Sequence, residues 1–220
     1  MELSQKANLK RRILMSVIGV IINGICVAFF KIAAFGVDPF QSFMAGLDLS
    51  IPLSFGLLYT IVNASLLIFS LVFDRHYIGL ATFINMFLLG YVTEFTMYLL
   101  RLTPIFAEPA LVVRVFCLVF GLIFICLGAS LYMTADLGVS TYDAVALIIV
   151  NTWKKGKFFF VRVITDLVCV LLGCGLFLIG GGLIKDIPTI VGIGTLITAF
   201  CMGPVIEIFN KLVSKPLLKK

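Results

Sequence analysis

The sequence has few charged residues and few of the residues that build soluble catalytic sites. Charged residues occupy 13% of its 220 positions, about half the usual share. It has one histidine and one tryptophan, and its six cysteines include no CxxC pair. We find no nucleophile beside a base, no metal-ligand spacing and no phosphate-binding glycine loop. These absences argue against an enzyme, and we expect neither a cofactor nor a metal.

Apolar residues, in contrast, make up 61% of the chain, and its mean hydropathy is +1.18. A segment of about 20 apolar residues crosses the roughly 30 Å hydrocarbon core of a bilayer. Six such segments are present, and nothing remains for a soluble domain. They run from Ile13 to Ala34, Leu53 to Phe73, Ile78 to Leu100, Leu111 to Met133, Phe158 to Leu183 and Pro188 to Leu212. The expected fold class is therefore all-α, a polytopic membrane protein surrounded by the lipid bilayer.

The distribution of basic residues predicts the orientation of these spans. With the N-terminus in the cytoplasm, twelve of the seventeen Lys and Arg residues face the cytoplasm, and three, Lys31, Arg101 and Lys185, face outward. Cytoplasmic loops of membrane proteins carry such an excess. We therefore expect both termini in the cytoplasm, with basic tails at 1–11 and 214–220. The net charge of +6 is explained by orientation, and we expect no nucleic-acid partner.

The chain also resembles itself, which predicts two repeats at 12–105 and 106–213. An offset of 102 positions pairs seven identical residues within 26 positions, and an offset of 113 pairs a second block. The first block pairs Arg12, Gly36 and Val37, among others, with Arg114, Gly138 and Val139; the second pairs Gly79, Thr82 and Glu94, among others, with Gly192, Thr195 and Glu207. Because each repeat holds three spans, the second must enter the membrane from the opposite side. Inverted repeats of this kind are a recurring transporter architecture.

Two related stretches, "AAFGVDPFQSFMAGLD" and "TADLGVSTYDAVALII", follow the first span of each repeat. Asp38 is a typical helix N-cap, followed by a proline and by Gln41 at the capping-box position; Ser140, Thr141 and Asp143 repeat the pattern. The predicted helices are about 15 Å long at 1.5 Å per residue, so each is an extra half-helix, re-entrant or interfacial.

Two interpretations of these half-helices stay open. In the first, Asp38 and Ser140 only satisfy backbone N–H groups, which find no water inside a membrane. In the second, the two N-termini converge on a solute, which would make all five named residues of the two stretches part of a binding site. The negative charge of Asp38 then favours a zwitterion over a bare anion.

Three polar residues lie about 13 to 15 Å inside the spans when depth is counted at 1.5 Å per residue. They are Asn23, Asn63 and Asp166, and the repeat alignment pairs Asn63 with Asp166. An ionisable residue at that depth is a functional candidate, here for proton or cation coupling. The alternative is a structural ion pair with Arg162, four residues earlier on the same helix face.

The paired elements "FGVDPFQSFMAGL" and "LGVSTYDAVALII", in a chain with duplicated three-span halves, resemble the YczE/YyaS/YitT family of bacterial membrane proteins. The resemblance covers essentially the whole chain and implies a bacterial plasma-membrane protein. It assigns no role to any residue. The two elements differ at their caps, Asp38-Pro39 in one and Ser140-Thr141 in the other, so their chemistry is not identical.

Two functions fit these observations. The first is a secondary transporter or exporter of a small polar or zwitterionic solute, proton-coupled through Asp166. The second is a membrane scaffold or accessory protein for a biosynthetic or signalling partner. A transporter needs a water-reachable path past Asn23, Asn63 and Asp166, whereas a scaffold needs packed spans. The sequence leaves the substrate, the direction of transport and the oligomeric state open, a homo-oligomer included.

Overall fold

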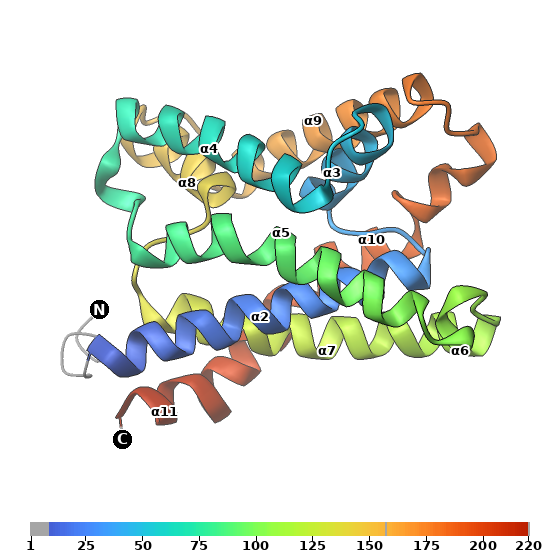
Figure 1. Ribbon diagram of the computed structural model, residues 1–220. Helices are drawn as coiled ribbons and strands as arrows, with labels where there is room; N and C mark the ends of the chain where they lie inside the picture. Colours follow the sequence, from blue (N-terminus) through green and yellow to red (C-terminus); the bar gives the residue numbers. More distant parts are fainter. Residues whose placement is uncertain (1–8, 157, 220) are drawn as a thin grey trace.

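The computed structural model describes residues 9–156 and 158–219, and all of its regular structure is helical (Figure 1). The long helices are α2 (Leu9–Ala33), α4 (Phe55–Phe73), α5 (Leu80–Arg101), α7 (Leu111–Ala135), α9 (Phe158–Ile179) and α10 (Ile193–Phe209). The shorter elements are α3 (Pro39–Ser50), η1 (Arg75–Tyr77), α6 (Pro104–Ala107), α8 (Thr141–Leu147), η2 (Ile148–Thr152), η3 (Ile184–Thr189), η4 (Asn210–Ser214) and α11 (Lys215–Lys219). The expected all-α fold is confirmed.

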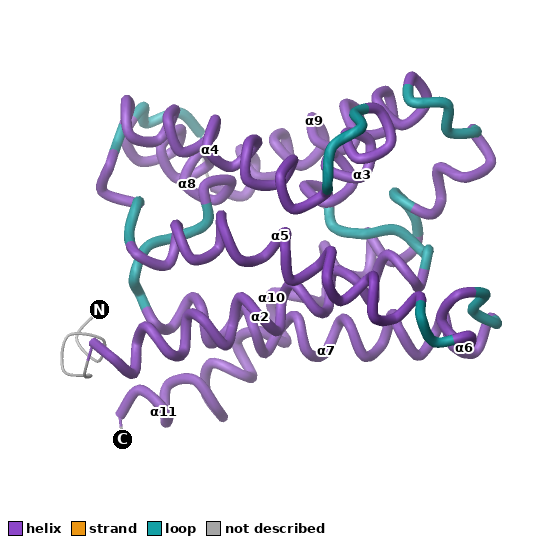
Figure 2. Tube along the Cα trace, viewed as in Figure 1, coloured by secondary structure: helices purple, strands orange, loops and turns teal. Residues whose placement is uncertain are grey.

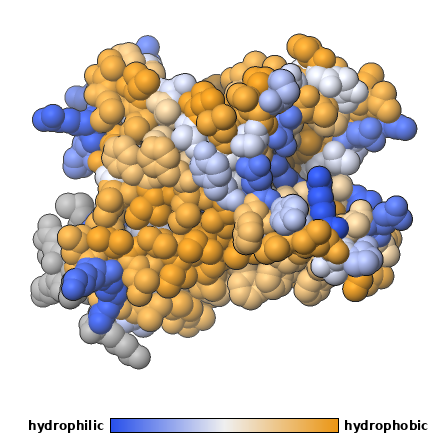
Figure 3. Space-filling view, in the orientation of Figure 1, coloured by the Kyte–Doolittle hydropathy of each residue, from blue (hydrophilic) through white to orange (hydrophobic). Residues whose placement is uncertain are grey.

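Five helices in the described part of the chain are long and apolar enough to cross a membrane: α2, α4, α5, α7 and α9. They contain 19 to 25 residues, which at 1.5 Å per residue gives roughly 28 to 38 Å. Large apolar side chains cover much of the surface (Figure 3). Such a surface is stable in lipid, so this is a multi-pass protein in contact with the bilayer.

The sixth predicted span, Pro188–Leu212, is divided among three elements. Its start lies in η3, a 3₁₀ helix, and its centre is α10, which has 17 residues and contains Pro204. The last residues lie in η4, a π-helical turn. Helical structure then continues into α11, so the chain is helical without a break from Ile193 to Lys219.

The helices form two layers. In Figure 1, α2, α7 and α10 lie in one layer, α3, α4, α8 and α9 lie in the other, and α5 lies between them. Contacts agree with this arrangement, because α5 packs against both α2 and α4, α3 packs against α9, and α8 packs against α4. The N-terminal end of α2 and the C-terminal end of α11 lie at the same end of the molecule (Figures 1 and 2). The loops gather at the two ends of the bundle (Figure 2).

The pair α2 and α7 forms the centre of the lower layer. The two backbones touch where Gly19 faces Gly128, since a Cβ atom added to Gly19 would lie 2.6 Å from the Gly128 carbonyl oxygen. Only glycine allows so close an approach, which is common between membrane helices. Buried side chains of α2, among them Val20, Cys26 and Phe30, belong to the main core cluster of the protein. Close backbone contact and buried side chains therefore join the two helices.

Two arginines also join α2 and α7, each at the end of the other helix. Arg114 donates from Nε and Nη2 to two backbone oxygens, both at 2.8 Å. Arg12 donates from Nε at 2.7 Å and makes a second, shorter contact through Nη2. The acceptors are the carbonyl oxygens of Ala33 and Ala34 for Arg114, and those of Ala135 and Asp136 for Arg12. The last carbonyls of a helix lack backbone partners and attract positive charge, so each arginine stabilises the end of its neighbour.

Candidate functional site: a polar cavity between two short helices

The chain leaves α2 and α7 through two breaks with matching backbone geometry. The residue that follows each helix is left-handed, with φ of 51° at both Ala34 and Asp136. Two residues later a glycine also has positive φ, 94° at Gly36 and 107° at Gly138. Glycine adopts this conformation without steric cost. The Gly-Val pairs of the two sequence stretches therefore turn the chain from a long helix into a short one.

Each break is held by a helix from a distant part of the chain. The Thr195 hydroxyl donates to the Val37 carbonyl oxygen at 2.7 Å, and the Thr82 hydroxyl donates to the Val139 carbonyl oxygen at 2.6 Å. These threonines lie in the first turns of α10 and α5. The two short helices are consequently anchored at their start by the same kind of contact.

The two short helices begin where the sequence predicts. Asp38 Oδ1 accepts a hydrogen bond from the Gln41 backbone N–H at 3.1 Å, and Ser140 Oγ accepts one from Asp143 at 3.1 Å. Both caps are extended, and both are followed by helix, over 12 residues in α3 and 7 in α8. The predicted caps are confirmed. They satisfy N–H groups that an anionic solute would otherwise bind.

The second hydrogen bond of the expected capping box in α3, from the Gln41 side chain, is not formed, so this part of the prediction is wrong. In that motif the Gln41 side chain would turn back to the backbone of Asp38. Instead Gln41 Oε1 is buried and has no hydrogen-bond partner among the described residues. Its side chain, only 5% exposed, lines a cavity in the centre of the molecule.

This central cavity has a volume of about 160 Å³. Residues from eight helices line it, α2, α3, α4, α5, α7, α8, α9 and α10. It brings together seven of the nine residues that the sequence singles out: Asn23, Asp38, Gln41, Asn63, Ser140, Asp143 and Arg162. Its wall also includes Val27, Phe40, Tyr59, Asn85, Leu89, Ile125, Ala129, Tyr142 and Met202.

The other two predicted residues, Thr141 and Asp166, support the cavity from behind. Thr141 donates from Oγ1 to Asn63 Oδ1 at 2.6 Å, and both side chains are 1% exposed. Asp166 accepts a hydrogen bond from the Tyr142 hydroxyl at 2.6 Å. The side chains that α8 presents at its start are therefore bound to α4 on one side and to α9 on the other.

Arg162 joins the two acids nearest to it. Its Nε lies 3.2 Å from Asp166 Oδ1, so the predicted pair four residues apart is formed. Its Nη1 also bonds Asp143 on α8, a contact that sequence spacing does not predict. The guanidinium carbon lies 4.5 Å from the centre of the Tyr142 ring. Arg162 is therefore directed toward the cavity and does not extend toward the end of its helix.

The sequence analysis did not predict that aromatic side chains line the cavity. The rings of Phe40 and Tyr142 are stacked, with centroids 4.9 Å apart and planes inclined by 25°. The Tyr59 hydroxyl donates to Asn85 Oδ1 at 3.1 Å. Positions 40 and 142 are paired by the offset of 102, which is the signal that would have found them.

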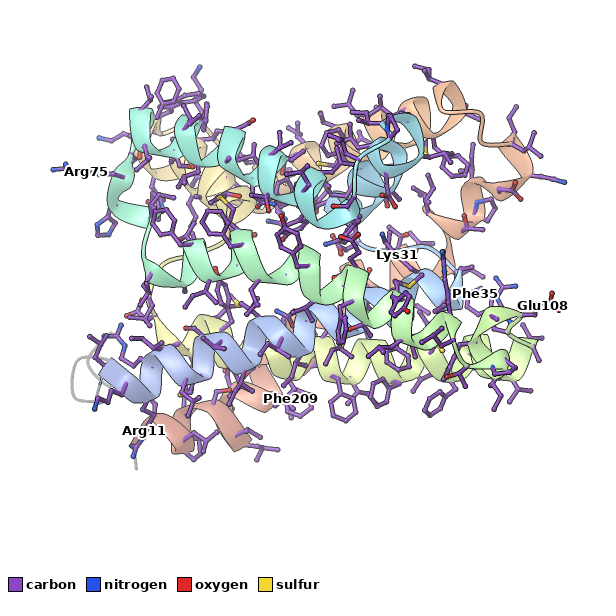
Figure 4. The ribbon with its side chains drawn as sticks, viewed as in Figure 1. Arg11, Lys31, Phe35, Arg75, Glu108 and Phe209 are labelled. Carbon is purple, nitrogen blue, oxygen red and sulfur yellow. The ribbon has the colours of Figure 1, made fainter. Side chains whose placement is uncertain are left out.

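A second, larger pocket lies next to the cavity; we call it the Lys31 pocket. Its volume is about 640 Å³, and its lining includes Lys31, Asp48, Phe55, Glu94 and Arg101. Lys31 Nζ lies 3.3 Å from the centre of the Phe55 ring and 3.6 Å from Asp48 Oδ2. In Figure 4 its side chain rises from the end of α2 toward the other layer. Figure 3 shows hydrophilic residues gathered in a hollow between the layers at that end.

Phe55 and Tyr59 lie between the two spaces. Phe55 lines the Lys31 pocket and Tyr59 lines the central cavity, and their ring centroids are 6.2 Å apart. Both side chains are almost fully buried. Two aromatic rings, one turn apart on α4, therefore separate the larger pocket from the cavity.

The polar groups of the site are mainly oxygen atoms of carboxylates, amides and hydroxyls, with one guanidinium. Within the described residues, no three His, Cys, Asp or Glu side chains gather to hold a metal ion. The cavity instead offers carboxylates, amide groups and hydroxyls in an otherwise apolar protein. Polar sites of this kind orient small molecules.

Comparison with known proteins identifies the family. Residues 10–211 match the model of a family of unknown function, DUF6198. The chain belongs to this family. It is also 26% identical over 203 residues to the uncharacterized protein YyaS of Bacillus subtilis (strain 168), covering 92% of this chain and 94% of that protein. No solved structure matches the chain. The resemblance to YyaS found in the sequence is thus confirmed.

Proposed function

We propose that this protein is a secondary transporter or exporter of a small polar or zwitterionic solute in the bacterial plasma membrane. The central cavity carries this proposal. It lies where all the principal helices meet, and it contains amide oxygens of Asn23 and Gln41 that have no partner within the described chain. Buried polar atoms are normally hydrogen-bonded. A transported solute would supply the missing partner.

The contacts at the breaks support the second part of the proposal, an inverted repeat with six spans. Arg12 and Arg114, paired in the sequence, each bind the end of the helix that carries the other. Thr82 and Thr195, also paired, bind the equivalent carbonyl oxygens of the two breaks. Reciprocal contacts are what a twofold axis in the membrane plane produces. In this arrangement α10 with η4 is the sixth span.

Two observations support an orientation with both termini in the cytoplasm. Basic residues favour that side by twelve to three, and the two ends of the described chain lie at the same end of the bundle (Figure 1). Six spans return the chain to its starting side. The Lys31 pocket would then face outward, and solute would reach the cavity by displacement of the Phe55 and Tyr59 rings.

Coupling to protons through Asp166 is the mechanistic part of the proposal. Two side chains of α9 bond α8, Arg162 through Asp143 and Asp166 through Tyr142, so protonation of Asp166 would weaken one of these two attachments and the pair with Arg162. Asp166 also accepts from Tyr142, whose ring stacks on Phe40. A proton on Asp166 would therefore alter contacts that reach both short helices.

The alternative function, a packed scaffold, requires Asn23, Asn63 and Asp166 to be sealed in apolar contacts. Two of these residues line the cavity, and the Asp166 side chain is 28% exposed. The cavity thus favours transport. The test is a thermal-shift screen of purified protein against a metabolite library, because a ligand that binds only the folded state raises its stability. Uptake of each hit into proteoliposomes then separates a transported solute from a bound one. A screen without hits, or a set of hits none of which is taken up, would contradict the proposal.

A further inference from the structure

The charges around the central cavity do not balance. Three carboxylates, Asp38, Asp143 and Asp166, face one guanidinium, Arg162. Arg162 forms ion pairs with Asp143 and Asp166, whereas Asp38 has no ion-pair partner among residues 9–156 and 158–219. A carboxylate away from bulk water is costly unless a positive charge accompanies it. When Asp38 is ionised, the site is therefore one cation short.

The polar atoms left without partners are hydrogen-bond acceptors. Gln41 Oε1 and Asn23 Oδ1 are buried and have no partner in the described chain, and both residues line the cavity beside Asp38. The amide oxygens of Asn63 and Asn85 are already occupied, the first by Thr141 and the second by Tyr59. A carboxylate and amide oxygens bind a cation, and an organic cation with N–H groups also donates hydrogen bonds to them.

The size and remaining wall of the cavity limit the rest of the ligand. Its volume is about 160 Å³, close to the roughly 150 Å³ that encloses a molecule such as benzene. Val27, Leu89 and Ile125 give part of the wall an apolar surface. The ligand group inside the cavity therefore has roughly six non-hydrogen atoms or fewer, with a polar end and an apolar body.

We propose that the central cavity binds the protonated amino group of a small organic amine, with Asp38 as its counter-charge and Gln41 and Asn23 as acceptors. A primary ammonium group carries one positive charge and three N–H donors, which matches the missing charge and the unpartnered oxygens. The assignment names the substrate class of the proposed transporter and rests on that function only for the claim that the amine is moved. Binding itself is independent of transport.

The first experiment measures binding by the full chain in detergent micelles. Propylammonium chloride is the probe, and 1-propanol, sodium propionate and sodium chloride at equal concentration are the controls. We expect propylammonium to raise the melting temperature in a saturable way and the three controls to leave it unchanged. A shift with propionate, an equal shift with sodium chloride, or no shift with propylammonium would each overturn the assignment.

Variants then connect the response to the cavity. Asp38→Asn removes the charge but keeps a good helix cap, and we expect it to weaken propylammonium binding at least about tenfold. Gln41→Leu should weaken binding by a smaller factor. The matched control is Glu207→Gln, because Glu207 is exposed on α10 and pairs with Lys211 outside the cavity. Unchanged binding in an Asp38→Asn variant that melts like the wild type would overturn the role of Asp38.

Uptake separates this assignment from the proposed function. Proteoliposomes are supplied with radiolabelled propylammonium and compared with liposomes that contain the Asp38→Asn variant. Saturable uptake that needs Asp38 supports both proposals. A thermal shift without uptake contradicts transport of this amine and leaves the ammonium site established. Uptake without any dependence on Asp38 contradicts the site and leaves transport established.

Discussion

The two breaks after α2 and α7 share their backbone and differ in their polar side chains. Both have a left-handed residue with φ of 51°, then a glycine with positive φ and an extended cap. At each break, a threonine in the first turn of a distant helix and an arginine in the first turn of a long helix donate hydrogen bonds to backbone carbonyl oxygens. The framework of the site is thus built twice by the same contacts.

The chemistry differs between them. At the first break Asp38 caps α3 and presents its carboxylate to the cavity. At the second, Ser140 caps α8 and also donates from Oγ to Asp143 Oδ2 at 2.7 Å, while Asp143 bonds Arg162. The negative charge at the second break is therefore neutralised, and that at the first is not. A duplicated framework can hold an asymmetric site because the backbone contacts do not depend on the side chains that face the cavity.

We expect the largest loss of stability from alanine at Gly36 or Gly138, the glycines with positive φ in the two breaks. A Cβ atom at Gly36 would lie 2.4 Å from the Gly192 nitrogen, and one at Gly138 would lie 2.5 Å from the Gly79 nitrogen. Backbone strain adds about 1 to 3 kcal/mol to this overlap. We expect Gly36→Ala and Gly138→Ala each to cost more than about 3 kcal/mol, measured as loss of folded protein in a thermal melt.

Gly175 provides the control for both glycine variants. It lies in α9, and a Cβ atom there has no neighbour within 4 Å. Gly175→Ala should leave the melting temperature unchanged or raise it, since alanine is the better helix former by about 1 kcal/mol. If only one of Gly36 and Gly138 proves sensitive, the breaks are not structurally equivalent.

Removal of the arginine contacts should cause the next largest loss of stability, and the loss should be the same for Arg12 and Arg114. Arg12→Gln and Arg114→Gln each remove two charged hydrogen bonds to the end of a helix. At about 1.5 kcal/mol or more for each such bond, with part of this recovered by glutamine, we expect a loss of about 2 kcal/mol in both variants. Arg75→Gln, in an exposed turn, is the control and should be neutral. A large loss in one variant alone would contradict the reciprocal arrangement.

Sequence analysis predicted the local features of the site but not its long-range contacts. The caps at Asp38 and Ser140 follow from residue types within four positions, and hydropathy located the five helices of the described chain that are long and apolar enough to cross a membrane. Asn23 and Asn63, which the sequence singles out by their depth in the spans, both line the cavity. Each of these inferences depends on spacing along one helix, which the sequence contains.

The contacts that were missed join residues far apart in the chain. Arg162 on α9 pairs with Asp143 on α8, and Lys31 near the end of α2 pairs with Asp48 near the end of α3. The sequence analysis used Arg114 only as the repeat partner of Arg12, although it binds the end of α2. Spacing gives no signal for such pairs, because they depend on how the helices cross. The repeat alignment contained part of this information, since it pairs Arg114 with Arg12.

The ion pairs of Arg162 should show a moderate effect that is specific to the second break. Arg162→Gln leaves Asp143 and Asp166 without their cation, and we expect a cost of about 2 kcal/mol, below the value for fully buried pairs because all three side chains are partly exposed. Asp166→Asn should cost roughly 1 kcal/mol, since Arg162 keeps Asp143. Melting temperatures of the single and double variants measure this coupling.

Uptake in the same variants decides whether Asp166 couples solute to protons. If it does, Asp166→Asn abolishes uptake driven by a pH gradient while leaving ligand binding largely intact. If the double variant is more stable than the sum of its parts and uptake persists, the ion pair is structural. Rescue should stay incomplete in either case, because Asp143 still lacks a cation in the double variant.

Removal of either helix cap should cause a smaller loss of stability, equal for the two caps. Ligand binding, in contrast, should be lost at only one of them. Asp38→Ala and Ser140→Ala each remove one acceptor for a backbone N–H, which costs about 1 kcal/mol. Thermal melts should therefore give similar losses. The response to propylammonium should disappear only in Asp38→Ala, and an equal loss of response in Ser140→Ala would contradict the asymmetry of the site.

The smallest effect is expected where the far ends of the two short helical segments are tied to neighbouring helices. The Ser50 hydroxyl donates to the Leu176 carbonyl oxygen at 2.6 Å, and the Thr152 hydroxyl donates to Asp74 Oδ2 at 2.6 Å. Asp74 lies just after α4, and the Thr152 hydroxyl, with the His76 backbone N–H, lowers its pKa. The offset of 102 pairs Ser50 with Thr152, so one contact can be tested against the other.

Only the Asp74 contact should depend on pH. A carboxyl whose folded pKa is lowered contributes stability above its unfolded pKa of about 3.9 and loses that contribution as the pH falls through the folded pKa. The Thr152→Val variant should therefore melt slightly below the wild type at neutral pH and match it in strong acid. The Ser50→Ala variant should show a deficit of about 0.5 kcal/mol at every pH, because a carbonyl oxygen does not titrate. If the Thr152→Val deficit persists unchanged in acid, Asp74 is not what holds the end of η2.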